Sequence, residues 1–373
     1  MNAERLHAIA DAVKDEMAQL NTASLVEELA QSLRQAVDQP NEPSHQQRVS
    51  SLRTELDEAL AKAPSNGFSP AWRDALKELG VADLVGEHLL GRIKQIFDRN
   101  EITPSIAADE MAPIAERVQQ LNAVLDQVQA SFKFFEIGAE QLEPGEFEIG
   151  FLIPRERVHD GLEELGKEFI KLTRILGPFQ EISTGPRDEL KVRSISSSAF
   201  GAFLLASPGL AYLIAKTLES LINSYEKVKG IRSAHETLKK SEADDKVLKE
   251  VAKQADDRMS RDIKALVKEL MAEADPKPER ARANELRKEL EVSLNALANR
   301  IDQGYTVEVR AGELPPPEDE DGEEPSAEEK KLRTIVEQVL EKQEKLNFAN
   351  DTGETILRLP EPTDGMGSTP PAS

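Results

Sequence analysis

The stretch FKFFEIGAEQLEPGEFEIGFLIP (132–154) decides the fold, because the texture of the sequence changes there. Its two ends, FKFFEI (132–137) and FEIGFLIP (147–154), are rich in Phe and Ile and alternate in part, and Pro144-Gly145 stands between them. Partly alternating apolar residues on either side of a Pro-Gly turn are typical of a β-hairpin. We therefore predict a small sheet in the middle of a chain that is otherwise helical.

The residues that follow complete a module around this sheet. In chain order the predicted elements are a helix over 156–176 that ends at Gly177-Pro178, strands over 179–184 and 190–205, and a helix from Ser207-Pro208. The expected order over residues 131–242 is β-β-α-β-β-α. A small sheet with two helices on one face would bury the apolar stripes of both helices.

Upstream of the sheet, apolar residues recur every three or four positions, and this spacing predicts an N-terminal helical bundle over residues 1–130. Ser69-Pro70 and Thr103-Pro104 mark two helix starts within it. Proline loses no hydrogen bond at the first helical position, and the preceding hydroxyl can accept from the next free amides.

Residues 243–304 are highly charged but keep apolar residues at helical spacing. Two long helices that meet near Asp275-Pro276 predict a charged helical hairpin, with a coiled coil to another chain as the alternative. The expected fold class is therefore mostly α: an N-terminal helical bundle, a small central α+β module and a C-terminal charged helical hairpin.

The last predicted segment, 305–373, begins with a strand at YTVEV (305–309). An acidic, Pro-rich linker and a helix over about 326–345, opened by a Ser-x-x-Glu capping box, follow it. The final dozen residues have the composition of a disordered tail.

ETILRLP (354–360) is the other β-like stretch near this end, and it supplies the candidate interaction residues Ile356, Leu357 and Leu359. One hypothesis is that it pairs with strand 305–309 and closes the chain between them as a loop. The alternative is that it is a docking peptide that adds to the edge of a partner's sheet.

Composition disfavours several classes of function. The 69 acidic and 47 basic residues leave a net charge of −22, which repels nucleic acid and anionic membranes. The chain has no Cys, which excludes thiolate catalysis, disulfides and Cys-based zinc sites.

Motifs for catalysis or cofactor binding are missing from the sequence as well. None of the five His residues lies at a metal-ligand spacing, and the sequence has neither a phosphate-binding Gly-rich loop nor a nucleophile elbow. Asp319 and Asp321 partly match a calcium loop, but Pro317 occupies its first ligand position. We therefore predict no catalytic, cofactor-binding or metal-binding residues and no cofactor.

An uncharged run, Ser194–Ala215, is the one stretch long enough to span a bilayer. Its serines and the break at Ser207-Pro208 favour a buried strand followed by a one-sided helix. Contact with a membrane through residues 199–222 remains the alternative. The charged N-terminus lacks the apolar stretch of a signal peptide, so we expect a cytoplasmic protein.

These observations favour a non-enzymatic interaction or assembly protein, an adaptor or scaffold, whose partners are other proteins, further copies of itself, or both. Nucleic acid is disfavoured as a partner by the net charge. The competing hypotheses are a membrane-contacting effector that uses residues 199–222 and an enzyme whose site no short motif reveals.

Overall fold

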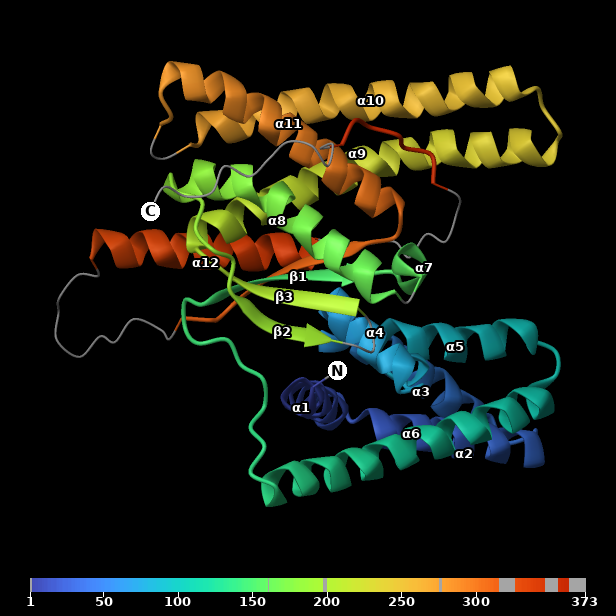
Figure 1. The fold of residues 1–373 in the computed structure, drawn as a ribbon. Helices are drawn as coiled ribbons and strands as arrows, with labels where there is room; N and C mark the ends of the chain where they lie inside the picture. Colours follow the sequence, from blue (N-terminus) through green and yellow to red (C-terminus); the bar gives the residue numbers. More distant parts are fainter. Residues whose placement is uncertain are drawn as a thin grey trace. The chain divides into compact units, whose positions relative to one another are not determined.

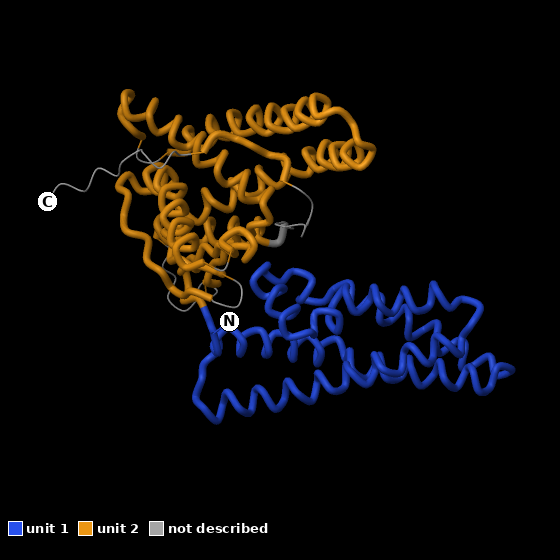
Figure 2. Tube along the Cα trace, turned by 45° about the vertical axis from the view of Figure 1, so that its right-hand side comes forward, with its two compact units in different colours: residues 1–141 blue, residues 142–373 orange. Residues whose placement is uncertain are grey.

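The computed structural model describes residues 2–159, 161–196, 200–274, 277–314, 326–345 and 355–361. These residues form twelve α-helices, two short 3-10 turns and a four-stranded antiparallel sheet (Figure 1). The fold is therefore mostly α with a small α+β module, as the sequence predicts. The chain divides into two compact units, Met1–Gln141 and Leu142–Ser373 (Figure 2). The division into four segments drawn from the sequence stays a prediction.

Unit 1 is the predicted helical bundle. Its elements are α1 (Ala3–Gln19), α2 (Thr22–Asp38), α3 (Pro43–Leu60), η1 (Pro64–Gly67), α4 (Pro70–Glu78), η2 (Ala82–Leu84), α5 (Gly86–Arg99) and α6 (Pro104–Phe134). Helix α2 packs against α3 and α6. Leu29, Leu52 and Met111, one from each of these helices, are fully buried in the common core. The helical spacing of apolar residues is thus explained by packing between helices.

The two predicted helix starts in unit 1 are confirmed, but they are capped differently. Helix α4 begins at Pro70, and the Ser69 hydroxyl accepts a 3.4 Å hydrogen bond from the Trp72 amide. Helix α6 begins at Pro104, yet the Thr103 hydroxyl makes no capping bond and lies 3.3 Å from Asn100 Oδ1. Asp275-Pro276, where the two helices of the charged hairpin were predicted to meet, lies outside the described residues.

The strand predicted at 132–137 is wrong, because helix α6 continues through Phe134. Phe132 stays on the buried side and stacks on His7, with ring centroids 4.6 Å apart. The helix ends where Glu136 takes a left-handed φ of 56° and the Ile137 amide donates to the Phe132 carbonyl. Packing of the helix has overridden the β-propensity of the Phe-rich sequence.

Unit 2 holds the sheet, whose strand order is β2-β3-β1-β4. Its elements are β1 (Phe147–Ile153), α7 (Arg155–Val158), α8 (Leu162–Thr184), β2 (Val192–Ser196), β3 (Phe200–Ala206), α9 (Pro208–Lys240), α10 (Asp245–Ala272), α11 (Arg280–Asp302), β4 (Thr306–Ala311) and α12 (Ala327–Lys345). Helices α8 and α9 pack on each other, α10 packs on α9 and α11, and α12 packs on α9 and β4.

Strand β1 lies inside the sheet and is buried along its whole length. Phe147, Ile149 and Phe151 alternate along it and join the apolar core of unit 2. On the other face, a Cβ on Gly150 would lie 2.8 Å from ring carbons of Phe203. Gly150 is therefore needed because the Phe203 ring fills the space that a side chain would take.

Two further strand predictions need correction. Residues 179–184 are the last turns of α8, which passes through Gly177-Pro178 instead of ending there. The helix continues because Phe179 and Ile182 extend its buried face. The single strand predicted at 190–205 is two neighbouring strands, β2 and β3, which pair antiparallel.

The strand predicted at 305–309 is present as β4, but it does not pair with residues 355–360, the described part of ETILRLP. It forms an antiparallel ladder with β1, in which Val309 lies opposite Ile149. The predicted pairing of the two segments is therefore wrong, because β4 pairs with β1 and the tail amides bond to side chains of α10 and α11. Asp319 and Asp321 of the calcium-like loop lie outside the described part of the chain.

The uncharged run holds the end of β2, all of β3 and the start of α9, so the predicted helix is confirmed, whereas the single buried strand predicted before it is two strands. Ser207 caps α9 by accepting a 3.3 Å bond from the Leu210 amide, and Leu213 and Leu218 are buried in the core. Within the part of the chain that the structure describes, none of the helices combines the length and the apolar character needed to cross a bilayer.

Candidate functional site

The tail segment (residues 355–361) lies against helices α10 and α11. It is the short red trace beside these helices in Figure 1. Ile356, Leu357 and Leu359 are 3%, 5% and 5% exposed and belong to the core of unit 2. The three predicted interaction residues are thus buried within their own chain, whereas the Arg358 side chain between them is exposed. Whether these residues contact a partner stays a prediction.

Four consecutive backbone amides of the tail segment donate to side-chain oxygens of two helices. The pairs are Ile356 and Leu357 to Asp302 Oδ2 at 2.7 and 2.8 Å, Arg358 to Asp256 Oδ1 at 2.8 Å, and Leu359 to Asn299 Oδ1 at 3.1 Å. We call Asp256 of α10 with Asn299 and Asp302 of α11 the acceptor face. It satisfies the amides in the way that a neighbouring strand normally would.

Asn299 recognises one residue of the tail segment from both sides. Its Oδ1 accepts from the Leu359 amide, and its Nδ2 donates to the Leu359 carbonyl at 2.9 Å. Pro360 comes next and has no amide hydrogen, so no acceptor is needed beyond the one that binds the Leu359 amide. The side chain of Asn299 is buried, which holds this two-way contact in a setting with little competing water.

A charged contact fixes the far end of the tail segment. The buried Arg300 lies 3.3 Å from Glu361 Oε2, and it also binds Glu168 of α8 at 2.6 Å. Asn299 Nδ2 donates to the other oxygen of Glu361 at 2.8 Å. A carboxylate two residues after Leu359 is therefore part of the pattern that this surface accepts.

Asp302 is held by a short relay of polar groups from α9. The Tyr225 hydroxyl donates to Asp302 Oδ1 at 3.0 Å, and Arg232 donates to the same hydroxyl at 2.6 Å. Burial raises the pKa of Asp302 above its ordinary value, while the Ile356 and Leu357 amides and Tyr225 act against that rise. Burial likewise raises the pKa of Asp256. Both carboxylates thus depend on tail amides to offset their desolvation.

The acceptor residues are what sequence reasoning missed. Asp256, Asn299 and Asp302 are polar residues among many in a chain with 69 acidic side chains, and no motif distinguishes them. The one available signal is that Asn299 and Asp302 stand three residues apart, and so on one face, at the end of a helix with an apolar stripe. That spacing alone does not indicate that a peptide lies over them.

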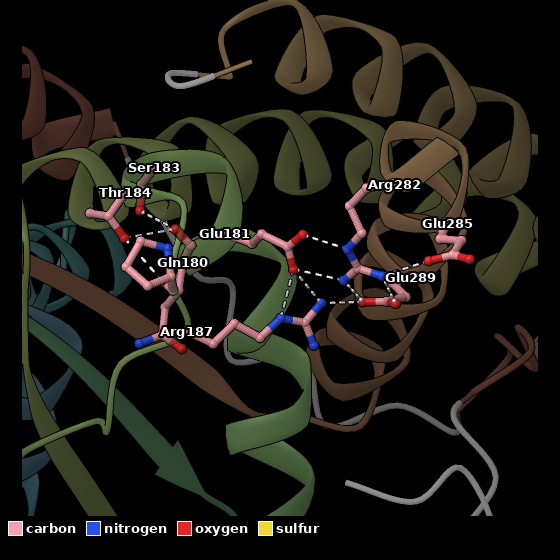
Figure 3. Close-up of polar contacts among 9 residues, drawn as sticks. Gln180, Glu181, Ser183, Thr184, Arg187, Arg282, Glu285 and Glu289 are labelled. Atoms are coloured by element: carbon pink, nitrogen blue, oxygen red, sulfur yellow. Dashed lines mark hydrogen bonds and ion pairs between the residues drawn. The ribbon is translucent and has the colours of Figure 1, made fainter. Parts of the chain in front are cut away.

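A second polar cluster ties the end of α8 to the start of α11. Arg282 binds both carboxylate oxygens of Glu181 at 2.6 and 2.7 Å and contacts Glu289 at 3.0 Å. Arg187 donates to Glu181 at 2.9 Å and also pairs with Glu289. Figure 3 shows the two guanidinium groups between these two carboxylates. Arg282 also contacts Glu285 at 3.0 Å. Both guanidinium groups are thus engaged by carboxylates of the same unit, so we interpret this cluster as structural.

Hydrogen bonds from Arg282 and, to a smaller extent, from Arg187 lower the pKa of Glu181 and so keep that carboxylate ionised. Beside the cluster, the last turn of α8 is closed by side chains. Thr184 donates to the Gln180 carbonyl at 3.0 Å, and Gln180 Nε2 donates to the Asp188 carbonyl at 2.8 Å. The helix end that sequence reasoning misplaced is thus fastened by local bonds.

A surface groove in unit 2 gives weaker support for a binding site than the acceptor face does. A groove of about 370 Å³ is lined by residues of α9, α10 and α12, and its lysines face an equal number of carboxylates: Lys216, Lys227 and Lys342 with Glu219, Asp262 and Glu269. Lys342 pairs with Glu219, and Lys216 pairs with Glu273. No group of three or more potential metal ligands occurs among the residues described.

Comparison with protein-family models, with curated proteins and with solved structures finds no match to this chain, so the acceptor face and its tail segment are interpreted from their own geometry.

Proposed function

We propose that the protein is a non-enzymatic interaction or assembly protein, an adaptor or scaffold, that recognises short peptide segments through the acceptor face of unit 2. The observation that carries the proposal is the match between four consecutive tail amides and the side-chain oxygens of Asp256, Asn299 and Asp302. Chain connectivity alone would not require such a match.

The energetics of the acceptor face support a role in binding. A buried carboxylate that lacks its hydrogen-bond donors is costly, by roughly 1–3 kcal/mol or more for a charged group. Asp302 and Asn299 are 2% and 4% exposed, so their oxygens need the tail amides or a replacement for them. A peptide that supplies amides to these oxygens and apolar side chains to the core would satisfy both needs.

The pattern seated on the acceptor face defines the peptide class. It is two apolar residues, one position that faces solvent, a third apolar residue, proline and an acidic residue, as in ILRLPE (356–361). Backbone bonds fix the segment in place, and the three buried side chains with Glu361 give selectivity. Each fully buried aliphatic side chain contributes about 1.5–3 kcal/mol.

A surface that binds backbone amides and apolar side chains is suited to protein partners. The net charge of −22 disfavours nucleic acid as a partner. The competing membrane hypothesis gains no comparable support, because the apolar residues of 199–222 that would meet lipid include Leu210, Leu213 and Leu218, which are buried. A cytoplasmic setting is part of the proposal and rests on the sequence expectation.

Peptide binding to the full chain tests the proposal. The probe is a labelled synthetic peptide of residues 354–362, and the receptor is the full chain with its own tail segment disabled by Leu357→Asp and Leu359→Asp. We expect this receptor to bind the peptide, and the wild-type chain to bind it far more weakly, because the attached segment competes at an effective concentration on the order of mM.

Two controls make the result specific. A peptide with Ser in place of the three apolar residues should not bind, and Asn299→Ala in the receptor should weaken binding of the intact peptide. Absence of binding to a receptor that circular dichroism shows to be folded would refute the proposed function.

A further inference from the structure

We propose that the tail segment is exchanged between copies of this chain, so that residues 355–361 of one copy occupy the acceptor face of a second copy. This inference rests on the proposed function and names the partner. It commits to a second copy as the occupant because every copy carries both the acceptor face and the one segment known to fit it.

The contacts of the tail segment are separable from the rest of the fold. Its four amides bond to side chains of α10 and α11, and within the described residues no backbone-to-backbone bond joins it to the sheet. Strand β4, the edge strand nearest to it in sequence, is paired with β1 instead. Removal of the tail segment therefore breaks no strand ladder.

Reciprocal exchange preserves every contact of the closed chain. The second copy offers the same Asp302, Asn299 and Arg300, and the incoming Leu359 and Glu361 meet them with the same geometry. Exchange of an identical element is for this reason a low-cost route to a dimer. A partner of different sequence would have to reproduce both the apolar positions and the acidic one.

The connection to α12 sets a distance limit on the exchange. Nine residues, 346–354, join the end of α12 to the tail segment. Ten steps of fully extended chain reach at most about 36 Å. The end of α12 in one copy must therefore lie within about that distance of the acceptor face of the other copy.

Charge and competition set the conditions for exchange. Each copy carries a net charge of −22, so approach of two copies is opposed at low ionic strength and eased by salt. In the wild-type chain the attached segment also competes at an effective concentration on the order of mM. The decisive test removes that competition from both copies.

The test is complementation between two full-length variants. The face variant carries Asp302→Ala and Asn299→Ala and keeps its tail segment, and the tail variant carries Leu357→Asp and Leu359→Asp and keeps its acceptor face. Each variant alone should be a monomer by light scattering and native mass spectrometry. Mixed at equal concentration, they should form a 1:1 heterodimer whose fraction rises with salt.

A matched control defines the contact. A chain that carries all four substitutions should form no heterodimer with the tail variant, since it brings no usable segment. If a double variant is not folded, the single substitutions Asn299→Ala and Leu359→Asp take its place, and the mixture is scored in the same way.

The outcomes separate the two proposals. Heterodimer formation supports exchange. Binding of the synthetic 354–362 peptide to the tail variant without heterodimer formation overturns exchange and leaves the proposed function intact. Failure of both the peptide and the face variant to bind the tail variant overturns exchange and the proposed function together.

Discussion

The Asn299 side chain holds the tail segment at Leu359, because it bonds to both the amide and the carbonyl of that residue. Asn299→Ala leaves that amide and carbonyl unpaired in a buried setting, so we expect unit 2 to lose about 1–3 kcal/mol of unfolding free energy. Chemical denaturation of the full chain measures the loss. Hydrogen exchange at the Leu359 amide should become faster at the same time.

Arg358→Ala is the control on the same segment. Its amide still donates to Asp256, and only an exposed side chain is removed. The expected change in unfolding free energy is within about 0.5 kcal/mol. Equal losses from Asn299→Ala and Arg358→Ala would contradict the acceptor-face interpretation.

Glu181 makes part of the stability depend on pH. Arg282 lowers its pKa below the ordinary value of 4.5, so its stabilising contribution is fully present above pH 4.5 and is lost as the pH falls through the folded-state pKa. Glu181→Gln should therefore be less stable than wild type at neutral pH. The difference should shrink as the pH falls below 4.5, which urea denaturation at several pH values would measure. A difference that grows toward acid would show the sign to be wrong.

At the scale of elements, strand β1 is the most constrained part of the sheet. Gly150→Ala places a methyl group where the Phe203 ring and the Glu308 side chain lie, 2.8 Å away. We expect a loss of about 1–3 kcal/mol in unfolding free energy, the usual cost of overpacking a core. Thermal or chemical unfolding of the full chain measures it.

Gly166→Ala is the matched control inside helix α8. A Cβ there meets nothing within 4 Å, and alanine favours the helix over glycine by up to about 1 kcal/mol. The same substitution should thus destabilise at one glycine and stabilise at the other. If Gly150→Ala were neutral, the close packing described for β1 would be in error.

Helices were predictable from the sequence because both their periodicity and their start signals are local. Ser69-Pro70 and Ser207-Pro208 begin helices as predicted, and the stripe of α9 is buried. Strands were less predictable, since residues 132–137 and 179–184 have the composition of strands but continue helices. Their buried faces follow from packing partners elsewhere in the chain, which local propensity does not contain.

For the candidate site, the sequence indicated the tail segment but not the acceptor face, because the acceptor face depends on long-range packing. Ile356, Leu357 and Leu359 stand out in the sequence as an apolar cluster in a polar region, so they could be singled out, but their burial within their own chain could not be foreseen. The acceptor face brings together Asp256 and Asn299 from different helices. The predicted partner of the tail segment, β4, pairs with β1 instead. Long-range pairing of this kind is visible only in the fold.

At the scale of the whole molecule, the two compact units have separate apolar cores. Each has the size of an ordinary domain. We expect fragments 1–141 and 142–373 to fold independently, with helical circular dichroism and cooperative unfolding. An unfolded 1–141 fragment would show that its core needs the rest of the chain.

Because the two units have separate apolar cores, a substitution in one unit should not destabilise the other. Asn299→Ala in the full chain should speed hydrogen exchange in unit 2 and leave the core amides of unit 1 unchanged, because no residue of the acceptor face belongs to the core of unit 1. Exchange followed by mass spectrometry resolves the two units in one experiment. Faster exchange in both would indicate cooperative unfolding of the whole chain.

The way the tail segment is attached also has a mechanical consequence. Tension applied beyond residue 361 loads a few side-chain bonds in sequence, whereas β4 is held to β1 by a backbone ladder. The tail segment should therefore detach first and release the chain after the end of α12, sixteen residues or at most about 58 Å. The core of unit 2 would meanwhile stay folded. The released chain would then extend under load and limit the force that reaches the core of unit 2.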